Sequence, residues 1–271
     1  MELEAKYERL KDYLRSLGRV AVAFSGGVDS AFLLKAAKEA VGDQAIAVTV
    51  RSRLMPCREF DEAKQFCAQE QIRHIVCEID PFFIDGFADN PPNRCYLCKK
   101  ELFRKIQDVA IQNGIAEVAE GSNLDDNGDY RPGLLAIREL GIRSPLQEVG
   151  FTKQEIRQLS KRLGLPTWNK PSFACLASRF AYGEKVTPER LNMVERAEQI
   201  LAGLGFSQFR VRVHGGLARL EVLPKEFTKL LNCREQVCRE LKELGFTYIS
   251  MDLAGYRTGS MNEALCKDTA G

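Results

Sequence analysis

The chain has 271 residues, of which 45% are hydrophobic, so it is long enough for one large domain or two small ones around a real core. Its 39 Lys and Arg residues nearly balance 37 Asp and Glu residues, and the net charge of +2 argues against a global attraction to nucleic acid or a membrane surface. The N-terminus is charged from the start, and no stretch reaches the about 20 apolar residues that cross a bilayer. We therefore expect a soluble, cytoplasmic protein.

Nine cysteines without a secretory signal favour a reducing compartment, where thiols serve packing, metal binding or catalysis. Six lie in helical or strand-like surroundings, and most of them are expected to be small core residues: Cys57, Cys67, Cys77, Cys233, Cys238 and Cys266. The other three, Cys95, Cys98 and Cys175, have unusual neighbours. The two histidines, His74 and His214, are too few for a zinc site built from Cys and His pairs.

A glycine-rich turn follows the first predicted strand. Residues 20–24 are an apolar run typical of a buried parallel strand, residues 31–37 predict a helix, and Ser-Gly-Gly-Val-Asp-Ser occupies positions 25–30 between them. Such a turn presents backbone N–H groups and a positive helix end to an anion. It lacks the Lys-Ser/Thr ending of the P-loop and the three-glycine spacing of the dinucleotide fingerprint. It resembles the PP-loop of the ATP pyrophosphatase superfamily, whose members activate a substrate by adenylation and release pyrophosphate.

The resemblance implies a role for each residue of this turn. The main-chain amides at Gly26 and Gly27 and the hydroxyls of Ser25 and Ser30 would hold phosphate oxygens of ATP, and Asp29 would help to hold Mg²⁺. An ordinary tight turn would need the glycines but not the flanking Ser and Asp residues. We therefore interpret the turn as an ATP site.

The elements around this turn alternate in type, in the order β-α-β. Residues 2–17 predict an amphipathic helix, and further strands are expected at 45–50, 72–79 and 116–119, with a helix at 56–71. This order predicts an α/β fold, Rossmann-like, in which helices flank a parallel sheet.

A polar loop at 120–133 follows the last of these strands, at the edge of the sheet where ligands bind. Its candidate contacts to the nucleotide or to Mg²⁺ are Gly121, Asp129 and Arg131. Turn capping explains its acidic and Asn residues equally well.

Two cysteines begin the helix that follows the prolines at 91–92. Cys95 and Cys98 are close together at the start of this helix, whose positive end favours the thiolate form that binds metal. The alternative is a pair of buried structural cysteines, because a lone Cys-x-x-Cys pair is also compatible with packing.

Residues 152–271 predict a helix, a binding loop and a second, smaller domain. Thr152 and Glu155 predict a capping box at the start of a helix over 152–163, and the non-periodic segment 166–180 predicts a binding loop. Beyond it, the order α-β-β-α-β, with a hairpin at Gly215 and Gly216, predicts a smaller α+β domain. We therefore predict a PP-loop domain over 1–182 and a small domain for substrate binding or oligomerisation over 183–271.

Together these motifs resemble one family along nearly the whole chain. The segments that carry the resemblance are the PP-loop, the loop at 169–180 with its Ser-Arg-Phe triplet, residues 129–134 and the Arg-Val-Arg strand at 210–212. They look like the LarE-type sulfurtransferases, which act in assembly of the nickel-pincer nucleotide cofactor of lactate racemase. The resemblance implies that ATP adenylates a carboxylate of pyridinium-3,5-biscarboxylic acid mononucleotide and that sulfur then replaces a carboxylate oxygen.

Two modes of sulfur delivery occur in this family. One sacrifices a cysteine four residues before the Ser of the triplet, where this chain has Ala174, and its members lack the pair found here as Cys95 and Cys98. The other holds a [4Fe-4S] cluster on three cysteines, and an iron without a cysteine ligand carries hydrosulfide. Cys175 lies three residues before Ser178, so the resemblance favours a cluster on Cys95, Cys98 and Cys175, reloaded by sulfide or another donor. Sacrifice of Cys175 remains the alternative.

The resemblance also implies polar site residues and a homo-oligomer. Arg210 and Arg212 fall on the same side of a strand, which is either solvated or turned to a phosphate. The full set of implied catalytic and substrate-binding residues is Lys99, Ser178, Arg179, Glu198, Arg210, Arg212 and Glu221.

Three other classes of protein share part of this pattern. A tRNA thiolase would usually add zinc-binding clusters or an RNA-binding domain, together with a basic surface, so we expect no nucleic-acid partner. An amide-forming synthetase would need no clustered thiols. An AMP-binding regulator would release no pyrophosphate from any carboxylate substrate.

Overall fold

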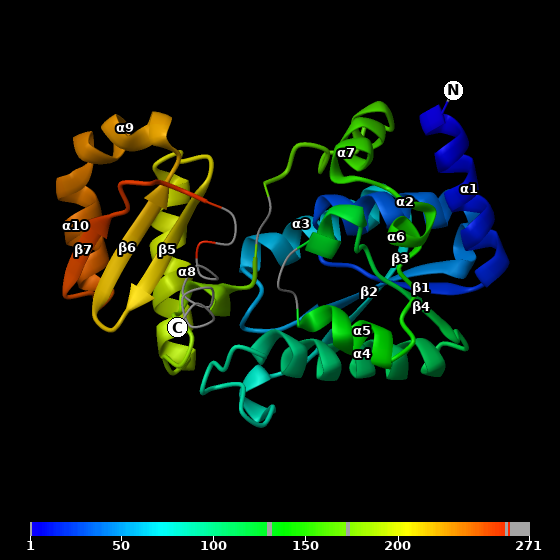
Figure 1. Ribbon diagram of the computed structural model, residues 1–271, viewed down its shortest axis with the longest axis horizontal. Coiled ribbons are helices and arrows are strands. Elements are labelled where there is room, and N and C mark those ends of the chain that lie inside the picture. The colour runs from blue at the N-terminus through cyan, green and yellow to red at the C-terminus, as the bar shows by residue number, and fades with distance from the viewer. Residues whose placement is uncertain (1, 129–131, 172–173, 258–259, 261–271) are drawn as a thin grey trace. The chain divides into compact units, whose positions relative to one another are not determined.

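The computed structural model describes residues 2–128, 132–171, 174–257 and 260 (Figure 1). Two compact units divide the chain: Met1–Ile84 with Asn93–Phe173, and Asp85–Pro92 with Ala174–Gly271. The second unit thus begins inside the loop at 166–180, before the predicted boundary at residue 183, and it includes a short segment from the first half of the chain. The functions assigned to the two predicted domains stay predictions.

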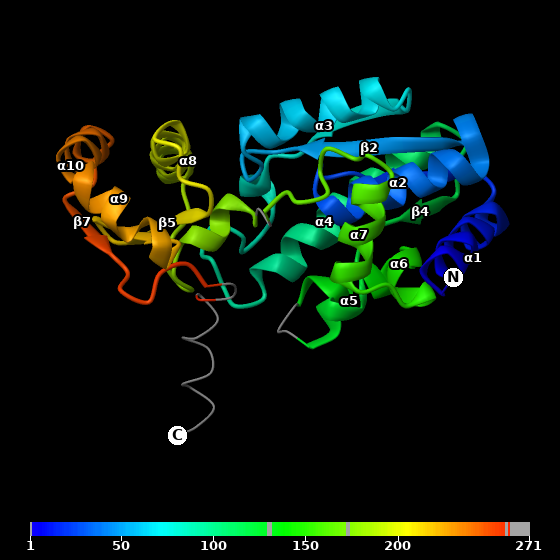
Figure 2. The ribbon, with the colours of Figure 1, turned by 90° about the horizontal axis from the view of Figure 1, so that it is seen from above.

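The first unit is built on a four-stranded parallel sheet in the order β3-β2-β1-β4 (Figures 1 and 2). Its strands are β1 (Val20–Ala23), β2 (Ala45–Arg51), β3 (Arg73–Glu78) and β4 (Glu117–Ala119). Its helices are α1 (Glu2–Leu17), α2 (Val28–Val41), α3 (Cys57–Gln69), α4 (Arg94–Gln112), α5 (Gly133–Glu139), α6 (Pro145–Val149) and α7 (Lys153–Arg162). The predicted parallel sheet with flanking helices is confirmed.

Both faces of this sheet are covered by apolar layers. Val20 and Val22 of β1 belong to the core shared with α1, α2, α3, α6 and α7, whereas Ala21 belongs to the core shared with α4 and α5. Figure 1 shows these two groups of helices on opposite sides of the sheet. Burial on both faces explains why β1 is continuously apolar in sequence.

The capping box predicted at Thr152 is present at the start of α7. The Thr152 side chain accepts from the backbone N–H of Glu155, and the Glu155 carboxylate accepts from the backbone N–H of Thr152 at 2.8 Å. Two orphan donors at the helix end are thereby satisfied, which fixes where α7 starts.

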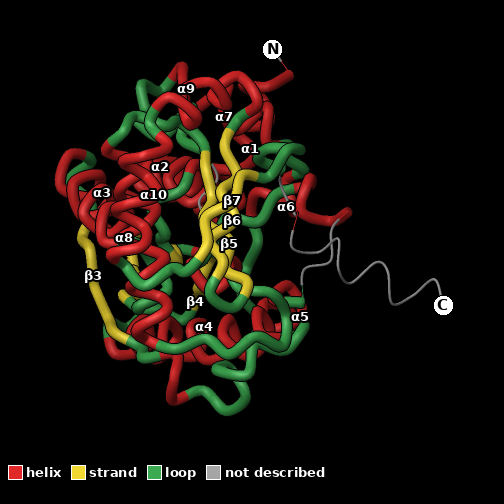
Figure 3. Tube along the Cα trace, turned by 90° about the vertical axis from the view of Figure 1, so that its left-hand side faces the viewer, coloured by secondary structure: helices red, strands yellow, loops and turns green. Residues whose placement is uncertain are grey.

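The second unit contains a three-stranded sheet in the order β5-β6-β7, and Figure 3 shows these strands side by side. Its elements are α8 (Pro188–Gly203), β5 (Phe209–His214), β6 (Leu217–Val222), α9 (Phe227–Asn232), α10 (Arg234–Glu243) and β7 (Tyr248–Met251). The predicted hairpin is confirmed by the antiparallel pairing of β5 with β6. The order α-β-β-α-β predicts one helix between the last two strands, and this is wrong: Cys233, at φ −101° and ψ 15°, leaves the helical region and separates α9 from α10.

Within the part of the chain that the structure describes, no helix combines the length and the apolar character needed to cross a membrane.

Candidate active site

The PP-loop joins the end of β1 to the start of α2 and has the backbone of an anion cradle. Gly26 adopts φ +73°, a left-handed conformation that glycine takes without strain, and Gly27 is the N-cap of α2 with no side-chain hydrogen bond to the helix end. The hydroxyls of Ser25 and Ser30 are 3.2 Å apart. The first N–H groups of α2 and two hydroxyls thus occupy one short turn, an arrangement that suits phosphate oxygens.

The predicted loop residue Gly121 lies directly against this turn. A Cβ atom at Gly121 would be 3.0 Å from the Ser30 backbone nitrogen and 3.1 Å from the Asp29 carbonyl carbon. The close approach brings the carboxyl edge of β4 onto the PP-loop, as expected for a parallel sheet. Asp129 and Arg131, the other candidates in this loop, lie outside the described residues.

Asp29 has partners from two segments that are distant in sequence. The Lys153 ammonium donates to Asp29 Oδ2, and Asn123 Nδ2 donates to Asp29 Oδ1 at 3.4 Å. Lys153 is the first residue of α7, so the Thr152 capping box also fixes where this lysine projects. Lys153 was not among the site residues predicted from the sequence, and its one local signal was its place directly after the N-cap.

The pair Cys95 and Cys98 occupies the start of α4 in the first unit. Both thiols are partly buried and neither forms a disulfide, and three-residue spacing puts them on one face of the helix. Arg94 is 4% exposed, and its guanidinium nitrogen Nη2 lies 3.8 Å from Cys95 Sγ.

Lys99 follows this pair and packs on the first residue of α5. A Cβ atom at Gly133 would be 2.5 Å from Lys99 Cδ and 3.1 Å from Cε, so the absence of a side chain at Gly133 leaves room for the lysine stem. The predicted contact of Lys99 with substrate stays a prediction.

Replacing Gly133 with alanine is expected to displace Lys99 and to slow turnover on the order of tenfold if Lys99 contacts substrate. The matched control is Gly203→Ala at the end of α8, where a Cβ atom has no neighbour within 4 Å. Gly141, just after α5, is unsuitable because its φ of +65° would strain an alanine. Steady-state kinetics of both variants test this, and unchanged turnover in Gly133→Ala would remove Lys99 from the site.

Cys175 is exposed in the second unit, and Arg179 holds the backbone around it. The Arg179 Nη1 group donates to the carbonyl oxygens of Ala174 and Cys175 at 2.6 and 3.0 Å, and its other nitrogens form a paired contact with Glu198 at 2.8 and 2.9 Å. The Ser178 hydroxyl also donates to the Cys175 carbonyl, at 2.7 Å. Arg179 is 0% exposed, so these contacts favour positioning of the cysteine loop. Its predicted contact with substrate charge stays a prediction.

Arg212 joins this network from β5. It donates to both carboxylate oxygens of Glu221 at 3.1 and 3.0 Å and to the Ser178 carbonyl at 2.8 Å. Glu198, from α8, also accepts from the Val211 backbone N–H at 3.1 Å. The structure thus brings together five of the predicted substrate-binding and catalytic residues of this unit: Ser178, Arg179, Glu198, Arg212 and Glu221.

Arg210 is the sixth, and it is 3% exposed on the same face of β5 as Arg212. Burial, and secondly the positive charge of Arg179, lower the pKa of Arg210 to about 10. Its guanidinium lies 5.1 Å from the centre of the Tyr256 ring. An anionic ligand would stabilise the charged form of this buried guanidinium.

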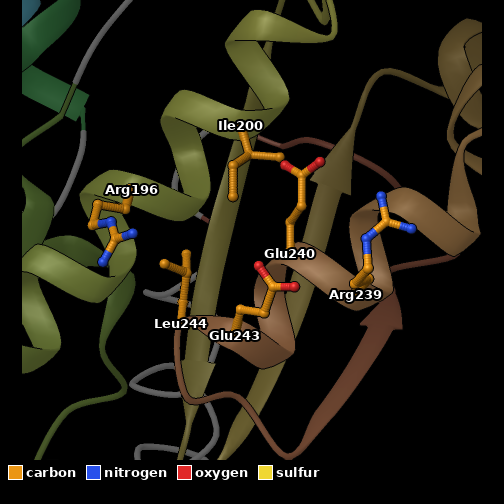
Figure 4. A pocket seen from close by; sticks show the side chains of 6 residues that line it. All are labelled: Arg196, Ile200, Arg239, Glu240, Glu243 and Leu244. Atoms are coloured by element: carbon orange, nitrogen blue, oxygen red, sulfur yellow. The ribbon is translucent and has the colours of Figure 1, made fainter.

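Two other features bear on where a ligand could bind. Among the residues that the structure describes, no group of three or more His, Cys, Asp and Glu side chains is arranged to hold a metal ion. Figure 4 shows a hollow in the second unit, lined by Arg196, Ile200, Arg239, Glu240, Glu243 and Leu244. None of the predicted site residues lines it, and the PP-loop remains the best-formed candidate.

Comparison with known proteins supports the interpretation of residues 25–30 as a PP-loop. A family model described as NAD synthase matches residues 2–100. A protein from Synechocystis, described as uncharacterized, is 40% identical over 98% of this chain and 100% of its own length. Pyridinium-3,5-bisthiocarboxylic acid mononucleotide synthase from Lactiplantibacillus plantarum is 39% identical over 98% of this chain and 96% of its own length. The chain belongs to the LarE family.

Membership of the LarE family places the chain among the ATP-using enzymes of the PP-loop superfamily. A more distant relative is a glutamine-hydrolyzing GMP synthase from Aspergillus oryzae, which is 27% identical over 74% of this chain and 43% of its own length. The two resemblances predicted from the motifs, to the PP-loop superfamily and to LarE, are therefore confirmed.

Proposed function

We propose that this protein is an ATP-dependent sulfurtransferase that converts carboxylates of pyridinium-3,5-biscarboxylic acid mononucleotide to thiocarboxylates. The observation that carries the proposal is the 39% identity over 98% of the chain to the Lactiplantibacillus plantarum synthase. The PP-loop geometry supports it, because that turn offers main-chain amides, two hydroxyls and Asp29 to Mg²⁺ and ATP.

The proposed chemistry has two steps. A substrate carboxylate oxygen attacks the α-phosphorus of ATP, forming a C–O–P bond, while the bond between the α-phosphorus and the bridging oxygen breaks and pyrophosphate leaves. Hydrosulfide then attacks the carbonyl carbon, a C–S bond forms and AMP leaves. The α2 amides and Lys153 stabilise negative charge on the phosphates. In the second unit, the buried cation Arg210 binds the phosphate of the substrate.

The thiols present suit a cluster held by three cysteines. Cys95 and Cys98 share one helix face, Cys175 is exposed, and none of the three is in a disulfide. When bound, a [4Fe-4S] cluster with three thiolate ligands supplies an iron with an open position for sulfide. Cys95 and Cys98 belong to the first unit and Cys175 to the second.

Iron and sulfide analysis tests the cluster. After anaerobic reconstitution we expect about four irons per chain with matching sulfide, lost when Cys95, Cys98 and Cys175 are all replaced by alanine. The matched control replaces Cys57, Cys233 and Cys238, which are also not buried, and should keep the iron. Wild-type protein without iron would contradict the cluster. A single turnover that removes the elements of H₂S from Cys175 would then establish the sacrificial mode.

Pyrophosphate release tests the enzyme function itself. We expect pyrophosphate to form from Mg-ATP only when the pyridinium dicarboxylate mononucleotide is present. Release that depends on ammonia would instead indicate an amide-forming synthetase, and release that depends on tRNA would indicate a tRNA thiolase. The homo-oligomer and the cytoplasmic location expected from the sequence stay predictions.

A further inference from the structure

We propose that Lys170 is a positioning residue that sets the direction of the Gly27 N–H in the PP-loop, with Glu59 and Glu62 of α3 holding the lysine in place. The proposal deepens the proposed function and rests on it, since it takes the PP-loop as the ATP site. All four residues belong to the first unit, although Lys170 is far from the PP-loop in sequence.

The Lys170 ammonium contacts three oxygens. Nζ lies 3.1 Å from the Gly26 carbonyl oxygen, 2.7 Å from Glu59 Oε2 and 2.7 Å from Glu62 Oε2. The Lys170 and Glu59 side chains are only 9% and 8% exposed. An ammonium has three N–H donors, and three acceptors surround this one. Lys170 is therefore committed to protein partners, which argues against a direct role in binding phosphate.

The ion pairs around Lys170 also favour a role in positioning the PP-loop over a role in attracting phosphate. Two carboxylates, the Lys170 ammonium and the Arg58 guanidinium, which lies 2.9 Å from Glu62 Oε1, leave this cluster without net charge beside a turn expected to bind polyanionic ATP. Burial acts to raise the pKa of Glu62, but the hydrogen bond and charge of Lys170, followed by those of Arg58, outweigh it and hold the pKa below its usual value. Glu62 therefore stays charged at neutral pH. A cluster without net charge adds little attraction for phosphate, so the contact of Lys170 with the Gly26 carbonyl is better explained as a clamp on the loop.

The clamp acts on one peptide unit. The Gly26 carbonyl and the Gly27 N–H share a planar peptide, and no cis peptide occurs among the described residues, so the two groups point in opposite directions. When Lys170 fixes the carbonyl oxygen, it also aims the Gly27 N–H away from the cluster. Gly27 is the N-cap of α2, and its N–H is one of the donors expected to hold phosphate.

Gly26 itself is packed against α3. A Cβ atom at Gly26 would be 3.2 Å from Ala63 Cβ and 3.4 Å from the Glu59 carbonyl oxygen. Gly26 is also at φ +73°, a conformation from which a glycine peptide can easily rotate. Packing on α3 limits where the loop lies, and the Lys170 bond sets which way this peptide faces.

The backbone of Lys170 is itself held, so the clamp has a fixed base. Its N–H donates to the Thr167 carbonyl at 2.9 Å, and its carbonyl accepts from Arg157 Nη2 at 2.9 Å. Arg157 belongs to α7, and its Nη1 also donates to the Trp168 carbonyl at 3.0 Å. The segment that carries Lys170 is thus tied to a regular helix.

The test replaces Lys170 with methionine, which keeps the length of the side chain but removes its donors. We expect faster backbone hydrogen exchange over residues 25–30 of the ATP-free protein, weaker binding of Mg-ATP, and turnover lower by on the order of 10²-fold from a misplaced phosphate. Lys170→Arg, which keeps the charge and the donors, should recover part of the loss. The matched control is Lys64→Met, an exposed lysine on α3 that lies over the Phe60 ring, and it should leave all three readouts unchanged.

The hydrogen-exchange measurement distinguishes a local effect on the PP-loop from a general loss of stability. It also tests the clamp separately from the proposed function. A purely structural role would lower the melting temperature, but at temperatures well below it the hydrogen exchange of residues 25–30 would be unchanged. That result would overturn the proposal. If Lys170→Met does not fold, Glu62→Gln replaces it, because Glu62 is 40% exposed and less critical to packing. Faster exchange in the loop of a protein whose wild type binds no ATP would support the clamp and count against the ATP site.

Discussion

Replacing Lys153 with methionine is expected to slow substrate-dependent pyrophosphate release by about 10²- to 10³-fold, the typical loss when one preorganised donor is removed from developing charge. The Lys153 ammonium pairs with Asp29 of the PP-loop. In the proposed function Mg²⁺ binds at Asp29, and this ammonium would then neutralise the phosphates. Because the capping box fixes the first turn of α7, the lysine is held there before ATP arrives.

Three further variants sharpen this prediction. Asp29→Asn should lose activity and also need higher Mg²⁺, whereas Lys153→Arg should keep part of the rate. The matched control is Lys161→Met on the same helix, since the Lys161 ammonium lies over the Trp168 ring instead of pairing with Asp29. Release measured in Lys153→Met within twofold of the wild-type rate would exclude Lys153 from the site.

Replacing Arg179 with methionine is expected to lower the free energy of unfolding by about 3–5 kcal/mol, because it leaves the Glu198 carboxylate buried without its partner. Both side chains are almost fully buried, at 0% and 9% exposed. The same change removes the donors that hold the carbonyls of Ala174 and Cys175, so sulfur transfer should fall as well.

A double variant distinguishes the buried charge from other effects. Arg179→Met combined with Glu198→Gln should be more stable than Arg179→Met alone, because the uncompensated charge is gone. Arg190→Met is the control: Arg190 pairs with Glu184 nearer the surface, at 24% and 21% exposed, and its loss should cost about 1 kcal/mol or less. Equal denaturation midpoints for Arg179→Met and wild type would contradict the account of this pair.

The features predicted correctly from the sequence depend on short-range rules. The PP-loop follows from a strand, glycines and a helix start within a few residues, and the α7 capping box follows from Thr152 and Glu155. The β5–β6 hairpin follows from two alternating runs around Gly215 and Gly216. Each of these signals lies within one or two elements, so a single sequence carries it.

The features missed depend on the tertiary fold. Lys153 and Asp29 are 124 positions apart, and Lys170 and Gly26 are 144 positions apart, so no local sequence pattern predicts either contact. Arg179 is fully buried and its donors are satisfied by Glu198 and by backbone carbonyls, whereas its predicted contact with substrate charge stays a prediction. The break at Cys233 also has no sequence signal such as Gly or Pro.

The central claim, that ATP activates the substrate carboxylate before sulfur enters, is tested most directly with a substrate whose carboxylates carry ¹⁸O. The carboxylate oxygen that attacks the α-phosphorus leaves with AMP when hydrosulfide attacks the carbonyl carbon. Mass spectrometry should therefore find one ¹⁸O atom in each AMP, formed together with one thiocarboxylate. Thiocarboxylate that accumulates with unlabelled AMP would show that ATP is cleaved without adenylating the carboxylate, and would contradict the account.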